Sequence, residues 1–205
     1  MPDSFIEVTE GTGKKLAAFE RTVNSQTVQD QRFVLAEPFL PSYTVAITTE
    51  VSLATANSHL LQIMAGANKR LLLRRIKVTQ LGAASTAQVC VFQLVRLTTA
   101  GTGGTAYTPR QFDPADGNAE ATAMTLPSSK GTEGVGLWTE TGVLWSTVPT
   151  AGSGQDVVDL DFRSGLRTKP PTIAAGTSNG LALKNVTAIT TTPTVHIYAE
   201  FVEDA

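Results

Sequence analysis

The sequence predicts an all-β fold, a jelly-roll-like antiparallel β-sandwich preceded by an extended N-terminal arm. The 205 residues include 30 threonines, 17 glycines and ten prolines, which divide the chain into short apolar stretches separated by turns. Several stretches alternate apolar and polar side chains with the two-residue period of a half-buried strand. Hydrophobic residues make up 41% of the chain, which is enough to bury one large core.

The first forty residues differ from the rest of the chain. Up to Glu37 they are polar, charged and weakly patterned, which is typical of a segment without a core of its own. We therefore expect residues 1–41 to form an extended arm or an edge hairpin, and residues 42–205 to form the sandwich domain.

Turn residues separate the expected strands at fairly regular spacing, as in the glycine-rich segment 100–106 and in segment 127–134. Eight or more strands spaced in this way are typical of a sandwich or a jelly roll. In chain order, the expected strands are Arg32–Ala36, Tyr43–Ala54, His59–Met64, Arg70–Gln80, Gln88–Thr98, Ala119–Thr125, Gly136–Val148, Asp156–Phe162, Leu181–Lys184 and Thr194–Val202.

The strand Asp156–Phe162 shows the alternation most clearly. Val158 and Leu160 fall on one face, whereas Asp159 and Asp161 fall on the other. One face is expected to join the core, and the opposite face to meet water or another subunit.

Charge is unevenly distributed, although the net charge is only −2. Residues 51–112 contain seven basic side chains and no acidic one, and residues 113–161 contain eight acidic side chains and one lysine. A net charge this small gives no general attraction to nucleic acid or to an anionic membrane, and we predict neither partner.

The basic block culminates in residues 69–77, which carry five positive charges. A regular strand would place Arg74 on the face of Ile76, and Arg75 and Lys77 on the face of Leu73, so the charges would be divided between faces. No aromatic side chains are interleaved for base stacking. We therefore expect pairing with the acidic block, in the same subunit or the next, and we assign a subunit interface to Arg74, Arg75, Lys77, Asp159 and Asp161.

The segment Gly11-Thr12-Gly13-Lys14-Lys15 looks at first like a phosphate-binding loop. A P-loop needs a glycine five residues before its Gly-Lys pair and a hydroxyl residue directly after it, but Val8 and Lys15 occupy those positions. We interpret the segment instead as part of a docking arm. The residues that we assign to partner binding by the arm are Gly11, Gly13, Lys14, Lys15, Phe19 and Arg21.

Side chains that commonly carry catalysis or bind metals are few and far apart. Two histidines, His59 and His196, and the single Cys90 give no triad and no zinc-ligand spacing. We expect His59 to bond a backbone carbonyl, His196 to be half-exposed, and Cys90 to be a small buried hydrophobe. Residues 113–118 favour an Asx-type turn over a calcium loop. The predictions are no enzymatic activity, no cofactor and no metal.

No apolar run approaches the roughly 18 residues of a membrane span, and the first residues do not begin a secretory signal. A single cysteine also excludes an internal disulfide framework. Together these features favour synthesis in a reducing, cytosol-like compartment.

Several short segments of the chain carry a resemblance to known proteins: residues 11–15, 68–76, 93–98, 103–109, 169–171, 180–184 and 198–201. These segments are similar to segments of small virion proteins of tailed bacteriophages. The resemblance implies a capsid decoration or cement protein that binds the major capsid protein and itself, often as a homotrimer. It further implies synthesis in the bacterial cytoplasm, a final location on the phage head, an arm that orders on assembly, and no catalytic residues to carry over.

Two alternatives stay open. A neck, tail or fibre component would assemble into a ring or spike rather than cover the shell. A carbohydrate-binding sandwich, or an enzyme built on one, would need exposed aromatic rings. Trp138 and Trp145, the only tryptophans, would face opposite sides of a regular strand unless a bulge at Gly142 changes the phase.

Overall fold

The structure is a computed structural model, and it describes residues 18–23, 26–31, 40–81, 83–146, 155–162, 169–190 and 193–204. The chain divides into two compact units, Met1–Phe39 and Leu40–Ala205. In the first unit, β1 (Ala18–Val23) pairs antiparallel with β2 (Gln26–Gln31). The strand expected at residues 32–36 lies outside the described residues.

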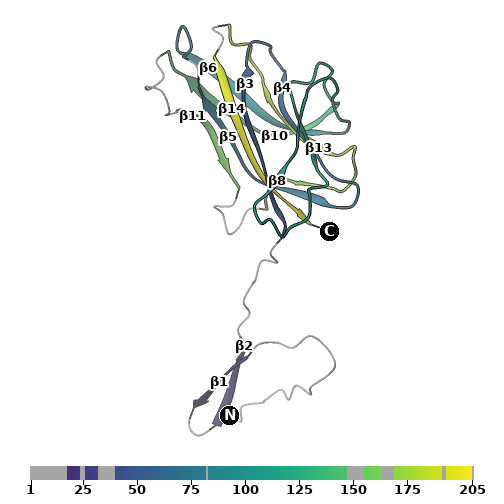
Figure 1. Ribbon diagram of the computed structural model, residues 1–205. Coiled ribbons are helices and arrows are strands. Elements are labelled where there is room, and N and C mark those ends of the chain that lie inside the picture. The colour runs from purple at the N-terminus through teal and green to yellow at the C-terminus, as the bar shows by residue number, and fades with distance from the viewer. Residues whose placement is uncertain are drawn as a thin grey trace. The chain divides into compact units, whose positions relative to one another are not determined.

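The second unit is an antiparallel β-sandwich, which confirms the all-β prediction (Figure 1). Sheet I has the strand order β11-β5-β14-β3-β8, and β12 also pairs with β5. Sheet II has the order β10-β6-β13-β4-β9-β7. The strands are β3 Ser42–Ser52, β4 His59–Met64, β5 Arg70–Gln80, β6 Gln88–Leu97, β7 Thr105–Tyr107, β8 Arg110–Gln111, β9 Thr122–Thr125, β10 Glu133–Leu144, β11 Gln155–Asp161, β12 Thr172–Ile173, β13 Gly180–Asn185 and β14 Thr194–Asp204.

The last two strands complete both sheets. β14 lies between β3 and β5 in sheet I, and β13 lies between β4 and β6 in sheet II. Ser42 at the start of β3 is the register partner of Val202 near the end of β14. The first strand of the sandwich therefore begins at the end of the sandwich where the last strand finishes (Figure 1). Neither sheet is continuous until the C-terminal strands have joined it.

The core lies between the inner faces of the two sheets. Its largest fully buried side chains include Tyr43 and Phe201 from sheet I and Phe92 from sheet II. The rings of Tyr43 and Phe201 stack with centroids 5.6 Å apart, a geometry that aromatic pairs favour. Val158 and Leu160 of β11 are buried as expected.

A β-bulge in β5 changes the pattern expected for the basic strand. The register with β14 passes from Leu73 to Arg75 and leaves Arg74 as the additional residue. The alternation therefore changes phase in mid-strand, and Leu73 and Ile76 both face the core. The prediction that Leu73, Arg75 and Lys77 share one face is wrong, because the two basic side chains lie on the outer face of sheet I.

Two connecting segments cross the outer face of sheet II, and we call them together the flap (residues 98–104 and 126–132). They pair with each other: Thr102 N–H donates to Ser129 O at 2.8 Å, and Thr98 N–H donates to Thr132 O at 3.0 Å. Gly101 permits a close approach to the sheet, because a Cβ there would lie 2.7 Å from both Gln62 Nε2 and Ser129 O. All six residues of β4 and all six residues of β13 are buried, so these two strands are covered on both faces.

Candidate functional site

The outer face of sheet I brings together most of the residues that the sequence assigns to an interface. Arg75 donates two hydrogen bonds to Asp159, from Nε to Oδ1 at 2.8 Å and from Nη2 to Oδ2 at 2.5 Å. Lys77 Nζ lies 2.9 Å from Asp156 Oδ2. The basic and acidic blocks therefore meet within one chain, which is one of the two arrangements expected.

These contacts shift the acid–base behaviour of the pair. The hydrogen bond to Asp159 raises the pKa of Arg75, and the same hydrogen bond lowers the pKa of Asp159. The two parallel hydrogen bonds hold both side chains in one orientation and stabilise the charged guanidinium and the charged carboxylate.

The charges continue in rows across three strands of sheet I. In one row Asp161 of β11 and Glu200 of β14 flank Arg75, and in the next row Asp159 and Tyr198 flank Lys77. Arg74 and Asp161 also have electrostatic or hydrogen-bonding partners. A face of this kind has compensated charges and suits specific recognition more than strong attraction.

Exposed apolar side chains mark the β6–β10 edge of sheet II. This edge lies beside β11 of sheet I, since a Cβ at Gly142 would collide with Val157 Cγ1. Val89 and Val143 are cross-strand neighbours on β6 and β10, and they are 60% and 43% exposed. Trp145 follows β10 and is 46% exposed, whereas Trp138 packs against the core. The irregularity of β10 lies between Glu133 and Trp138, so the bulge considered at Gly142 does not occur there.

A cavity of about 270 Å³ lies where β10 bulges away from β6. Its wall includes Leu97, Val135 and Ile173, together with Arg96, whose Nη1 donates to Thr172 O at 2.8 Å. Val135 is 70% exposed beside this hollow. The cavity could not be predicted from the sequence, because its lining comes from β6, β10 and residues 173–180, which meet only in the folded sandwich.

A buried polar network lies under the flap. Gly101 N–H donates to Gln62 Oε1 at 2.9 Å, and Gln62 Nε2 donates to His59 Nδ1 at 2.6 Å. His59 Nε2 lies 2.9 Å from Glu133 Oε1, and Lys184 Nζ donates to Glu133 Oε2 at 2.5 Å. The expectation that His59 bonds a backbone carbonyl is therefore wrong, since its partners are two side chains.

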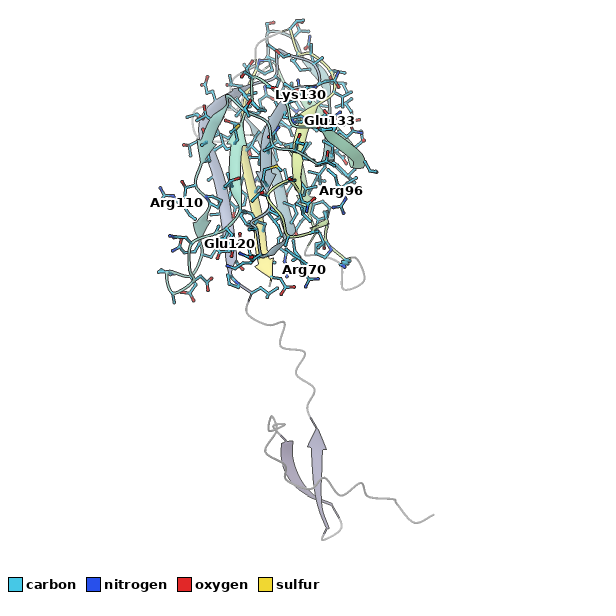
Figure 2. The ribbon with its side chains drawn as sticks, turned by 90° about the vertical axis from the view of Figure 1, so that its right-hand side faces the viewer. Arg70, Arg96, Arg110, Glu120, Lys130 and Glu133 are labelled. Carbon is cyan, nitrogen blue, oxygen red and sulfur yellow. The ribbon has the colours of Figure 1, made fainter. Side chains whose placement is uncertain are left out.

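Burial governs the titration of this network. Burial lowers the pKa of His59 and outweighs the opposing effect of the Glu133 carboxylate. Burial by itself raises the pKa of Glu133, but hydrogen bonds from Lys184 and His59 outweigh it and the pKa lies below its usual value. Lys130, labelled beside Glu133 in Figure 2, lies 3.8 Å from the same carboxylate. At neutral pH the network contains a neutral imidazole, one carboxylate and two ammonium groups.

A second carboxylate is buried at the other end of the sandwich, where Figure 2 labels Arg70 and Glu120. Glu203 has a side chain only 1% exposed and accepts hydrogen bonds from Ala121 N at 2.7 Å and from Glu120 N at 3.1 Å. Lys69 Nζ lies 3.4 Å from it. No feature of the sequence near Glu203 indicates that this carboxylate is buried, so its role was not predictable.

The other predicted positions are placed as follows. Cys90 is fully buried and His196 is half-buried on β14, as expected. Asp113 Oδ1 accepts from Ala115 N at 2.9 Å, which confirms the Asx-type turn. Phe19 and Arg21 lie in β1, opposite Asp30 and Val28 of β2. The remaining arm residues assigned to partner binding, Gly11, Gly13, Lys14 and Lys15, fall outside the described part of the chain.

Comparison with protein-family models, with curated proteins and with solved structures finds no match for this chain. Within the described residues, no group of three or more histidine, cysteine, aspartate or glutamate side chains is arranged to hold a metal ion. The same residues contain no helix with the length and apolarity needed to cross a membrane.

Proposed function

We propose that this chain is a structural protein of a tailed-bacteriophage virion, which decorates the capsid and binds both the major capsid protein and copies of itself. The resemblance of several segments to small virion proteins suggests this function. The observation that carries the proposal in the structure is the strand order of the sandwich.

The strand order supports a jelly-roll connection. Eight strands, β3, β4, β5, β6, β10, β11, β13 and β14, change sheet at every step along the chain except from β6 to β10. Sheet I therefore contains the series β3-β14-β5-β11, and sheet II contains the series β4-β13-β6-β10. Each series places the late strand between two early ones, as two interlocked Greek keys do. Jelly rolls are recurrent in viral capsid domains and in lectins.

The two exposed surfaces suit repeated protein contacts. The outer face of sheet I offers fixed, alternating charges around Arg75, and the β6–β10 edge offers Val89, Val143 and Trp145. Apolar area supplies most of the affinity in such contacts, and exposed ion pairs add only about 0.2–1 kcal/mol each. We assign self-association to the apolar edge, with the charged face contributing specificity.

The carbohydrate-binding alternative has less support. Of the two tryptophans, Trp138 packs against the core and Trp145 is 46% exposed, so they do not form a stacking platform together. A neck, tail or fibre position would use the same surfaces, and only the number of copies per particle separates it from a position on the shell.

The test is quantitative mass spectrometry of purified particles of the phage that encodes this chain, combined with light scattering of the isolated protein. A copy number comparable with that of the major capsid protein, and a trimeric mass, are expected. A few copies per particle would move the protein to the neck or tail. Absence from the particle would refute the proposal.

A further inference from the structure

A second apolar cluster lies beside the place where the flap is bonded to sheet II. On the outer face of sheet II, the side chains of Met64, Val95, Leu97 and Ala182 are at most 5% exposed and form a cluster separate from the main core. Ala182 is the register partner of Gln62, the residue that bonds the flap at Gly101. A contact that holds the flap therefore lies directly beside apolar surface that water would otherwise reach.

The hydrogen bonds that hold the flap have only one consistent direction. The backbone N–H of Gly101 can only donate, so Gln62 must present its oxygen to Gly101 and its NH₂ group to His59. Nδ1 of His59 must then accept, which places the ring proton on Nε2, facing the Glu133 carboxylate. The N–H group of Gly101 in the flap therefore determines, through Gln62, which ring nitrogen of His59 carries the proton.

Protonation of His59 breaks this series of bonds. A proton on Nδ1 would face the NH₂ group of Gln62, and rotating the Gln62 amide to accept it would turn that NH₂ group toward the N–H of Gly101. No orientation of Gln62 satisfies both neighbours. One hydrogen bond under the flap is lost in every arrangement, and a lost buried hydrogen bond is costly.

We propose that His59, Gln62 and Gly101 form a pH-sensitive latch, which holds the flap on sheet II at neutral pH and releases it on acidification. This inference does not depend on the proposed function. Release separates residues 98–104 from the sheet and gives water access to the cluster beside Gln62.

The charges around His59 come from three elements. Glu133 at the start of β10 stabilises a protonated imidazole, whereas Lys130 of the flap and Lys184 of β13 oppose it. Lys184 also bonds Glu133, so its positive charge offsets part of the carboxylate's attraction for a protonated His59. Burial of the ring adds to the opposition, and the pKa of His59 is lowered in the closed state.

The direction of the pH effect follows from that shift. An open flap exposes His59, whose pKa then returns to about 6.5. Below that pH the open form binds a proton that the closed form does not, so acid favours opening. The opening equilibrium should rise toward tenfold per pH unit below about pH 6.5, until the closed form is protonated as well.

The test uses hydrogen exchange of the full chain, followed by NMR from about pH 7.5 to about pH 5. The protection factor of the Gly101 amide, corrected for the intrinsic pH dependence of exchange, should fall toward tenfold per unit below about pH 6.5. Amides of β14 report global unfolding, so the Gly101 amide should stay less protected than they are at every pH. Constant protection at Gly101, or protection equal to that of the β14 amides throughout, would overturn the proposal.

The chain offers a matched control, because it contains only two histidines. His59→Gln should abolish the pH dependence of flap protection, and His196→Gln, on the outer face of sheet I, should retain it in full. The reverse result, or an unchanged slope in His59→Gln, would contradict the latch. The imidazole nitrogen shifts of the parent protein need no variant: they should show the Nε2–H tautomer of His59 at neutral pH, and an Nδ1–H tautomer would refute the arrangement.

Discussion

The sandwich buries the thiol of Cys90 completely and so keeps reagents away from it. Its thiol is fully buried between β6 neighbours, its Sγ donates weakly to Gly142 O, and burial raises its pKa to about 11. The thiolate is the reactive form, and little of it exists at neutral pH. We expect no reaction with a thiol reagent in the native state and complete reaction in denaturant. Absorbance kinetics with an aromatic disulfide reagent measure both, and rapid native labelling would contradict the buried position.

Glu203 should be the most sensitive single carboxylate in the second unit. Its side chain satisfies the backbone N–H groups of Glu120 and Ala121 and also meets Lys69. Glu203→Ala leaves these donors without an acceptor, and we expect a loss of about 2–4 kcal/mol in the free energy of unfolding. Urea denaturation measures the loss.

The neighbouring residue supplies the control for this change. Asp204 pairs with Arg70, whose side chain is 51% exposed, and exposed pairs contribute little. Asp204→Ala should therefore cost less than about 1 kcal/mol. Equal losses of unfolding free energy in the two variants would show that the buried hydrogen bonds of Glu203 contribute no more than the exposed ion pair of Asp204.

At the scale of the element, long strands were predictable and short ones were not. The bounds expected for β4 and β5 agree with the structure at both ends. The strands β7, β8 and β12 contain only two or three residues, which is too few for alternation to be recognised. These short strands form because they pair with the neighbouring strands β9, β3 and β5. A local sequence pattern does not predict such long-range pairing.

The β5 bulge and the buried network explain two further errors, which concern the face of Arg75 and the partners of His59. One additional residue, Arg74, reverses the face of everything after it, and period-two reasoning does not detect such an insertion. His59 and Glu133 are 74 positions apart, and Lys184 lies a further 51 positions along the chain. Only the completed sheet brings them together, so no sequence spacing could have indicated the network.

The pairing of β5 with β11 gives a prediction that separates folding from assembly. Arg75→Glu places a carboxylate among Asp159, Asp161 and Glu200, and like charges in neighbouring strands repel. This variant should be less stable, and Arg75→Glu with Asp159→Arg should recover most of the loss, because the exchanged pair restores opposite charges. Thermal unfolding measures stability in both variants.

The same two variants report on self-association when light scattering is added. If the charged face serves only the monomer, the double exchange restores the oligomer together with the stability. If it also contacts another subunit, stability returns and the oligomer does not. Lys130→Glu, which changes a flap residue instead, should leave association closer to that of the parent chain.

At the scale of the whole molecule, acid should weaken the sandwich in two stages. His59 has a lowered pKa, so its stabilising contribution is lost as pH falls below the unfolded value of about 6.5. Asp159 and Glu133 also have lowered pKa values, and their contributions are lost as pH falls through and below about 4.

The urea midpoint measured against pH should therefore decline in both ranges. Asp159→Asn should remove part of the lower stage and leave the upper stage intact. A midpoint that stays constant between about pH 6.5 and about pH 5 would contradict the contribution of His59.

The division of the chain into two units leads to the last prediction. All members of the main core cluster lie between Tyr43 and Phe201, so a chain that begins at Leu40 retains every one of them. Folding should then be independent of the first unit, and residues 40–205 should show the melting transition of the full chain.

The docking role proposed for residues 1–41 predicts a second result. If it is correct, residues 40–205 should bind capsids much more weakly than the full chain does. Calorimetry and co-sedimentation with particles that lack this protein measure the two properties on the same sample. If the shortened chain unfolds, the first unit contributes to the core. If it binds particles as well as the full chain does, the docking role assigned to Gly11, Lys14 and their neighbours is refuted.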